Sequence, residues 1–485
     1  MRSRSTGSPI VKLDSAIVTG ISSNSSATEQ FLGIPFAQPP TGNLRYNLPV
    51  ANQPYNSSIL FDPPHSDSED CLTINVIRPV GYETVKLPIV AVRNFHICRA
   101  KEYYLIIPQY IFGGGFDTGG SDTYDGSTIV QKSVNIQSPV IYVSFNHRTN
   151  GFGFLASQEI TDAGVANLGI QDQRLALRWV KKYIASFGGD PKKVTLFGVS
   201  SGAMSAAIHM LLNNGDNEGL FRAAFLLDGP PIPVGSYTHG QKYYDGAVIA
   251  TNCTGANDTL ACLRTAPAEA LQAYFMTLPN KASYQSLGSS WVPRVDGKLL
   301  KEDPQQLILK GSVAKIPFIS GDCEDEGTLF SLIQSNITTD ADFREFVNTI
   351  YYPNATAAEI DLVVKLYPSD LTAGSPFGTG DSDSLYPQYK RLAAFQGDNY
   401  HTIDTLNMFG STSNGTELQD YLINFAYNLN PNGRTVPAWP QYEVASKKLL
   451  TFVDGAAPNA TEITEDTYRA EALAGLTAIS LKYPL

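Results

Sequence analysis

The segment Gly-Val-Ser-Ser-Gly at residues 198–202 has the residue types and spacing of a serine nucleophile. Glycines let the backbone pass through a strained turn, and a serine at the tip projects its hydroxyl toward a carbonyl group. The pattern alone is weak, because a chain with 40 glycines produces it by chance. Its context is stronger, since residues 193–197 are typical of a strand and residues 203–212 of a buried helix. We therefore predict that Ser200 is a nucleophile, with a simple Gly-Ser turn as the alternative.

A serine nucleophile needs a general base. In enzymes whose serine stands on a turn of this kind, the catalytic residues occur along the chain in the order serine, acid, histidine. Three histidines follow Ser200: His209, His239 and His401. His209 falls on the helix that follows the serine, and His239 leaves too little chain for an intervening strand and acid loop. His401 is therefore the expected base, with an exposed loop histidine as the alternative.

The acid is expected between the serine and the histidine, on a loop after a strand. Residues 316–320 are typical of a buried strand and lead into Gly-Asp-Cys-Glu-Asp-Glu-Gly at residues 321–327. One of its carboxylates would hold the imidazole in its working tautomer and stabilise it when protonated. The candidates are Asp322, Glu324, Asp325 and Glu326, and a solvated acidic turn is the alternative.

Three successive glycines, Gly113 to Gly115, follow the apolar residues 110–112. Such a turn can direct backbone N–H groups at one point, which is how an oxyanion hole is built. A flexible turn is the alternative.

The elements that must position these residues are typical of an α/β protein. Unbroken apolar runs such as residues 139–145 indicate strands buried on both faces of a sheet. Residues 171–187 have helical spacing and end at Gly-Gly-Asp-Pro. Strand, helix and strand in this rhythm predict a doubly wound, mostly parallel sheet in a single domain, residues 1–485, after an antiparallel edge near the start. The expected strands cover residues 11–19, 29–34, 72–78, 89–92, 139–145, 194–197 and 316–320, and further helices cover 342–348 and 357–367.

Composition excludes several functions. The 485 residues are 43% hydrophobic, which is ample material for a core, and no apolar run is long enough to span a membrane. The net charge of −11 disfavours nucleic acid as a partner. The six histidines are scattered, so we expect neither a metal site nor a cofactor.

Cysteines and sequons indicate an oxidising compartment. Cys253 and Cys262 close a small loop that a disulfide could staple, whereas Cys71, Cys98 and Cys323 have no obvious partner. Eight Asn-x-Ser/Thr sequons exceed the roughly four expected by chance, which favours a secreted glycoprotein. Residues 1–9 have the positive charge of a signal peptide without its apolar run, so we expect export only from a longer N-terminal segment.

Taken together, these stretches resemble the type-B carboxylesterase/lipase family, the cholinesterase-like branch of the α/β-hydrolases, and in particular its secreted fungal members. The matching motifs occur in the family's order over almost the whole chain. They include Phe-Leu-Gly-Ile-Pro-Phe-Ala at 31–37, Ser-Glu-Asp-Cys-Leu at 68–72, Asn-Leu-Gly-Ile-Gln-Asp-Gln-Arg at 167–174 and Asp-Glu-Gly-Thr at 325–328.

The resemblance implies an α/β-hydrolase fold with helices on both sheet faces and long insertions. It also implies hydrolysis of a small-molecule or lipid carboxylic ester through an acyl-enzyme, without a cofactor. The implied residues are Ser200 as nucleophile, His401 as base and Glu326 as acid, with Gly114, Gly115 and the N–H of Ser201 in the oxyanion hole, the disulfide Cys253–Cys262, and a structural ion pair between Arg148 and Asp172.

Three departures from the family pattern concern the site. Val199 and Ser201 replace the usual Glu and Ala beside the nucleophile. The loop before Cys71, which is the lid in lipase members, is shortened. The stretch from Glu326 to His401 lacks about a helix and the strand that should deliver the histidine.

A fourth departure is the insertion at residues 92–109, which interrupts the strand that should run from 87–91 into 110–115. Its ends can be encoded with splice-donor and splice-acceptor sequences, and 18 residues keep the reading frame. We interpret it as a translated intron that loops out of the sheet, with a genuine surface insertion as the alternative. Given these departures, the competing functional hypothesis is a catalytically impaired isoform or a non-catalytic cholinesterase-like protein.

Overall fold

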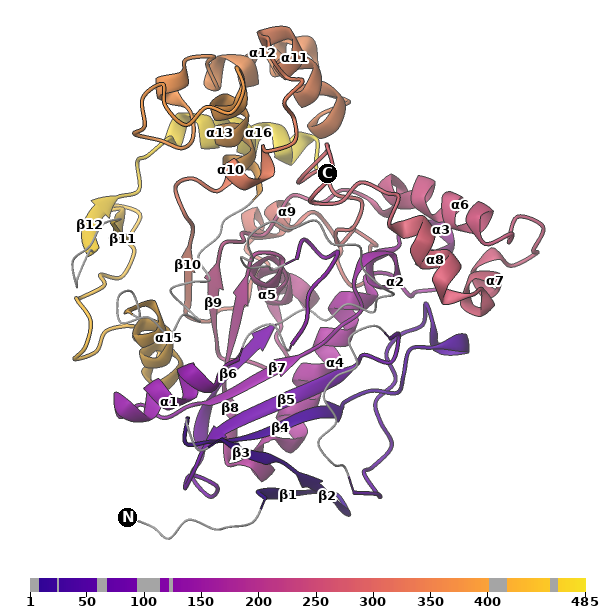
Figure 1. Cartoon of the computed structure of the whole chain (residues 1–485), viewed down its shortest axis with the longest axis vertical. Helices are drawn as coiled ribbons and strands as arrows, with labels where there is room; N and C mark the ends of the chain where they lie inside the picture. Colours follow the sequence, from indigo (N-terminus) through magenta and orange to yellow (C-terminus); the bar gives the residue numbers. More distant parts are fainter. Residues whose placement is uncertain are drawn as a thin grey trace.

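A twisted eight-stranded sheet forms the centre of the computed structural model, which describes residues 8–23, 26–58, 68–93, 114–121, 125–400, 417–453 and 461–485 (Figure 1). The first five strands are parallel, and the remaining pairings are antiparallel. From one edge to the other, the strands are β10 (Phe318–Gly321), β9 (Ala223–Leu227), β8 (Gly189–Val199), β6 (Leu87–Arg93), β7 (Ile141–Phe145), β5 (Thr73–Pro79), β4 (Thr28–Pro35) and β3 (Ile21–Ser23).

Helices cover both faces of the sheet because its inner strands are apolar on both faces. Every residue of β7 and β9 is buried. On one face, α4 (Leu168–Tyr183) and α5 (Ser201–Leu211) pack with β6 in one apolar cluster. On the other, α1 (Ser127–Asn135) and α15 (Glu417–Asn428) pack against Tyr142 and Phe225. This is the doubly wound arrangement predicted from the sequence.

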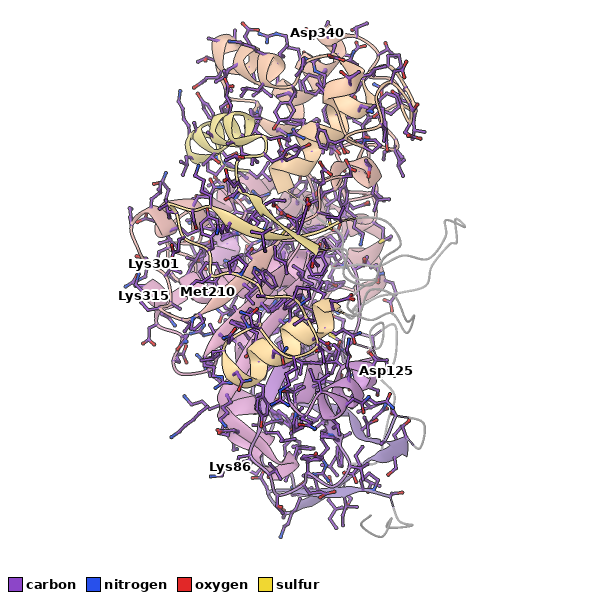
Figure 2. All side chains as sticks on the ribbon, turned by 90° about the vertical axis from the view of Figure 1, so that its left-hand side faces the viewer. Lys86, Asp125, Met210, Lys301, Lys315 and Asp340 are labelled. Atoms are coloured by element: carbon purple, nitrogen blue, oxygen red, sulfur yellow. A yellow bond between two sulfur atoms is a disulfide. The ribbon has the colours of Figure 1, made fainter. Side chains whose placement is uncertain are left out.

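The remaining helices lie beyond one end of the sheet (Figure 1). Two of them, α13 (Tyr389–Tyr400) and α16 (Ala470–Lys482), contribute Phe395 and Leu476 to the largest apolar cluster. Figure 2 shows the side chains filling the interior, while charged residues such as Lys86 and Asp340 point outward. These helices are α2 (Asn150–Phe154), α3 (Gln158–Asp162), α6 (Gln241–Ala250), α7 (Thr259–Thr265), α8 (Ala268–Phe275), α9 (Pro304–Leu309), α10 (Gly327–Phe330), α11 (Asp340–Phe346), α12 (Ala357–Leu366), α13 (Tyr389–Tyr400) and α16 (Ala470–Lys482).

Two expectations about strands are wrong. Residues 11–19 form a separate hairpin of β1 (Ile10–Leu13) and β2 (Ala16–Thr19), not an edge of the central sheet. A second separate hairpin pairs β11 (Lys448–Phe452) with β12 (Thr461–Glu465). The insertion does not begin where the strand ends, because β6 continues through the first two of its residues. Val92 pairs with Ser144 and Phe197, and Arg93 with Phe145. The rest of the insertion, and its predicted looping out, lie outside the described residues.

None of the described helices has the length and apolar character needed to cross a membrane.

Candidate active site

Ser200 stands at a sharp turn between β8 and α5. Its φ of 58° and ψ of −133° are strained for a residue with a side chain. Its backbone N–H donates to the carbonyl of Leu227 at the end of β9, over 2.9 Å. Glycines are required around it: a Cβ on Gly198 would lie 2.4 Å from the backbone of Gly202, and one on Gly229 would lie 2.4 Å from the Ser200 carbonyl oxygen. The sequence context of strand, turn and helix is therefore present, and the nucleophilic role of Ser200 stays a prediction.

The glycine turn lies against the first residue of α5. Gly114, Gly115 and Phe116 all have positive φ, at 97°, 60° and 64°. A Cβ on Gly114 would lie 1.7 Å from the carbonyl oxygen of Thr118, so only glycine fits there. The Phe116 N–H donates to Oγ of Ser201 over 3.3 Å. The serine that replaces the family's alanine thus joins the turn to the helix, a contact that the sequence reasoning did not foresee.

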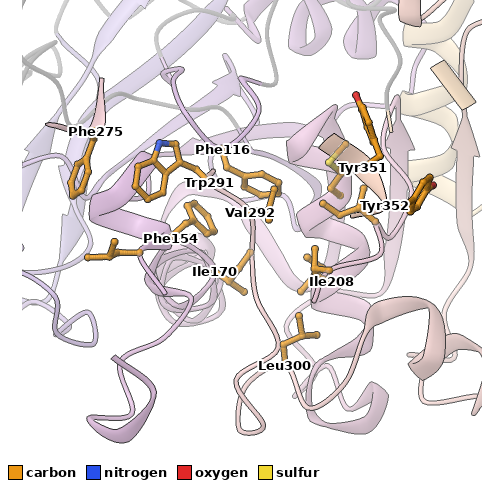
Figure 3. Close-up of a cluster of buried hydrophobic side chains, with 14 of the residues drawn as sticks. Phe116, Phe154, Ile170, Ile208, Phe275, Trp291, Val292, Leu300, Tyr351 and Tyr352 are labelled. Atoms are coloured by element: carbon orange, nitrogen blue, oxygen red, sulfur yellow. The ribbon is translucent and has the colours of Figure 1, made fainter. Parts of the chain in front are cut away.

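Packing holds the same turn from the core side. The ring of Phe116 is buried and meets Phe154 edge to face, with ring centroids 5.0 Å apart (Figure 3). Its carbonyl accepts the N–H of Asn150 over 2.8 Å. The turn is therefore part of the apolar core, as a rigid oxyanion hole requires.

The four candidate carboxylates after β10 have different surroundings. Asp322 and Glu324 are exposed. Asp325 accepts hydrogen bonds from the hydroxyl of Ser375 and the N–H of Phe377, over 2.7 and 2.8 Å, which fixes the loop. Glu326 is the buried member, at 6% exposure, and its Oε1 accepts the N–H of Cys323 over 2.7 Å.

Burial raises the pKa of Glu326 well above its usual range, and the nearby carboxylates of Asp322, Asp228 and Asp398 raise it further, against the hydrogen bond from Cys323. Asp228 directly follows β9, is buried, and donates its N–H to the carbonyl of Gly321 over 2.9 Å. The sequence reasoning missed it, although an Asp-Gly pair at the end of an apolar strand run was a visible signal.

His401 lies outside the described residues, but the helix that leads to it is described. The sequence predicts that the strand before the histidine is missing, and the described residues between β10 and α13 contain no strand. The backbone of the acid loop touches α13 directly, because a Cβ on Gly327 would lie 1.8 Å from the carbonyl oxygen of Ala393. Asp398, in the last turn of α13, accepts hydrogen bonds from Arg469 over 2.6 Å and from the hydroxyl of Tyr367 over 2.5 Å.

The disulfide Cys253–Cys262 is present, with Cα atoms 5.8 Å apart. Arg148 and Asp172 form the buried ion pair, with Nη2 and Oδ1 2.6 Å apart. The expectation that Cys71 lacks a partner is wrong, because this cysteine is disulfide-bonded. Within the described ranges, no three His, Cys, Asp or Glu side chains are grouped to hold a metal ion.

Comparison with known proteins identifies the family of this chain. A family model described as "Carboxylesterase family" matches residues 7–417. The chain belongs to the carboxylesterase family. It is accordingly a carboxylic ester hydrolase.

Several curated relatives of this carboxylesterase are fungal lipases. It is 36% identical to Lipase 2 of Diutina rugosa, over 89% of each chain. It is 35% identical to a secreted triacylglycerol lipase of Gibberella zeae, over 93% of this chain and 87% of that one. The crystal structure of Aspergillus niger EstA superimposes with a TM-score of 0.81 at 24% identity, over 99% of both chains, which shows the α/β-hydrolase fold.

Proposed function

We propose that this carboxylesterase cleaves its esters through a Ser-His-Glu triad and an acyl-enzyme, with Ser200 as nucleophile, His401 as general base and Glu326 as acid. The observation that carries the proposal is the strained turn at Ser200, which stands beside a turn of three positive-φ residues joined to it through Ser201. Strain of this kind persists where function requires it.

In the first half of the reaction, the Ser200 hydroxyl attacks the ester carbonyl and gives its proton to His401. The histidine passes this proton to the leaving alcohol, and the acyl group stays on the serine. In the second half, water attacks the acyl carbonyl and gives a proton to His401. The bond to Ser200 then breaks, the histidine returns the proton to the serine oxygen, and the carboxylic acid leaves. Glu326 orients the imidazole and stabilises its charged form.

The negative charge on the carbonyl oxygen is stabilised by backbone N–H groups of Gly114, Gly115 and Ser201. A single donor of this kind typically contributes a factor of about 10²–10³ to kcat. Because the turn is packed in the core, its donors need little reorganisation during the reaction.

For the substrate, we infer apolar acyl esters, since several curated relatives are named lipases. Two of them are named secreted, and we propose the same location for this chain. The exposure of every described sequon asparagine supports glycosylation. These are Asn56, Asn252, Asn257, Asn336 and Asn354.

Hydrolysis of a short p-nitrophenyl ester tests the triad. We expect Ser200→Ala to lower kcat by about 10⁴–10⁶, and Glu326→Gln to lower it less, because the acid transfers no proton. Ser205→Ala is the matched control. This serine is buried within α5, its hydroxyl has no hydrogen-bond partner among the described residues, and its loss should leave kcat nearly unchanged.

A fluorophosphonate should label wild-type protein once, at Ser200, as seen by mass spectrometry of the peptides. Unchanged hydrolysis in Ser200→Ala, or labelling at another serine, would contradict the proposed nucleophile.

A further inference from the structure

Lys281 contacts the glycine turn at three points. Its backbone N–H donates to Oδ2 of Asp117 over 3.2 Å, and its Nζ donates to Oγ1 of Thr118 over 2.8 Å. Its aliphatic stem runs past Gly115, where an added Cβ would lie 3.4 Å from the lysine Cδ. One residue from a distant part of the chain therefore touches three of the five residues at 114–118.

The segment that carries Lys281 is itself anchored in the core. It follows α8, and ten residues later Trp291 packs edge to face on Phe275, with ring centroids 5.1 Å apart (Figure 3). The backbone N–H of Ser290 donates to the carbonyl of Pro279 over 3.0 Å and closes the segment into a loop. The loop that carries Lys281 is therefore held in place by this ring contact and this hydrogen bond.

The buried carboxyl group of Asp117 explains why this turn needs the contact with Lys281. The side chain is buried directly after the three positive-φ residues. Burial raises its pKa to about 7, while the charge and the backbone N–H of Lys281 and the hydroxyl of Ser289 act in the opposite direction. A buried carboxyl group without such partners would destabilise the turn that contains it.

We propose that Lys281 is a positioning residue for the oxyanion hole: it holds residues 114–118 from outside, while Ser201 holds them from inside. The inference rests on the proposed function, because it assigns a catalytic use to the N–H groups of Gly114 and Gly115. Those donors must keep their direction during the reaction, and a displacement of about 1 Å can lower the rate about 100-fold.

Steady-state kinetics of Lys281→Met tests the catalytic part. Methionine keeps the stem and the backbone N–H and removes only the ammonium group. We expect kcat to fall about 10-fold with KM changed less than about 2-fold, because the lost interaction acts on the transition state. Lys298→Met is the matched control: this exposed lysine donates to the carbonyl of Thr161, and its loss should leave both constants unchanged.

Thr118→Val supplies an independent variant that keeps the side-chain shape and removes the acceptor of the lysine. We expect it to lower kcat in the same way, and the double variant with Lys281→Met to be no worse than Lys281→Met alone. Lys281→Arg, which can still donate to Thr118, should recover part of the rate. Wild-type kcat in both single variants, or multiplied losses in the double variant, would overturn the proposal.

Hydrogen exchange separates this proposal from the proposed function. Amides in peptides covering residues 114–121 should exchange at least about 10-fold faster in Lys281→Met than in wild type or Lys298→Met, since exchange follows local opening. Unchanged exchange overturns the positioning role whatever the activity. If wild type shows neither hydrolysis nor labelling of Ser200, the proposed function fails, and the exchange data still decide whether Lys281 holds the turn.

Discussion

Two residues of the site are held in states that oppose folding. Ser200 has a strained backbone, and Glu326 is a buried carboxyl group with a raised pKa. The cause at Glu326 is burial first and neighbouring acids second, and both favour its neutral form.

Replacing Glu326 by Gln should stabilise the protein, increasingly so at higher pH. The folded-state pKa lies above the ordinary value of 4.5, so the folded protein holds a proton that the unfolded chain has released. Wild-type stability therefore falls as pH rises above about 4.5 and through the folded pKa, whereas Gln does not titrate. Urea unfolding should show the advantage of Glu326→Gln growing between pH 5 and pH 8.

Glu324→Gln, at an exposed position of the same loop, is the control and should show no such trend. An advantage for Glu326→Gln that shrinks with rising pH would mean that the carboxylate is paired with a cation.

From the sequence alone, candidate site residues could be proposed only where they belong to local patterns. The strand before Ser200 and the helix after it indicated this serine as the nucleophile. The candidates for the acid were restricted to the four carboxylates of one loop. Lys281 and Asp117 could not be found in this way, because their contact joins residues 164 positions apart and neither belongs to a motif. Among the four carboxylates of the loop, the differences in burial arise only from tertiary packing.

At the scale of elements, the acid loop and α13 are in backbone contact. On Gly327, an alanine Cβ would lie 1.8 Å from the Ala393 carbonyl oxygen and 2.6 Å from the Gly397 nitrogen. We expect Gly327→Ala to push α10 away from α13, to lower the free energy of unfolding by about 1–3 kcal/mol as overpacking does, and to reduce kcat. Gly321→Ala is the control, since its Cβ would meet nothing within 4 Å. Urea unfolding and ester hydrolysis on both variants decide the point.

The last turn of α13 is tied to α16 by Asp398 and Arg469. Both side chains are largely buried, with 13% of Asp398 and 15% of Arg469 exposed. The guanidinium carbon of Arg469 also lies 4.5 Å from the ring centroid of Phe377. Arg469→Met should therefore destabilise the protein by about 3 kcal/mol, because it leaves Asp398 buried without its cation. Adding Asp398→Asn should recover part of this loss. A double variant whose loss equals the sum of the single losses would show that the pair is not coupled.

An unbroken apolar run made β7 predictable, whereas β9 was not predicted although every one of its residues is buried. The partners of the strands in space could not be predicted either. The hairpin of β1 and β2 has ordinary strand periodicity, and nothing in its sequence shows that it pairs only with itself. The missing strand before His401 was predicted from the shortened segment, but the helix α13 at residues 389–400 was not.

At the scale of the whole molecule, β6 lies in the middle of the sheet, and its last two residues, Val92 and Arg93, already belong to the insertion that we interpret as intronic. Deleting residues 92–109 would join Ala91 directly to the segment leading to the oxyanion turn. We expect the shortened protein to have a higher melting temperature and higher esterase activity, because closing a shorter connection costs less entropy and the strand would lead straight into the turn.

A variant with 18 Gly and Ser residues in place of 92–109 is the matched control and should show no such gain. Sequencing of the transcript provides a separate check: the interpretation fails if the coding segment lacks GT and AG ends.

The strain at Ser200 and the burial of Glu326 also bear on how such a gene would change over time. Glycine at 200 would relieve the positive φ, and glutamine at 326 would remove a buried acid, so a copy freed from selection for hydrolysis would gain stability from either change. In such a copy, these two residues should be replaced early. We expect both to persist only in lineages where hydrolysis is still selected, and their presence in this chain, beside an insertion and a shortened segment, fits a gene that has remained under that selection.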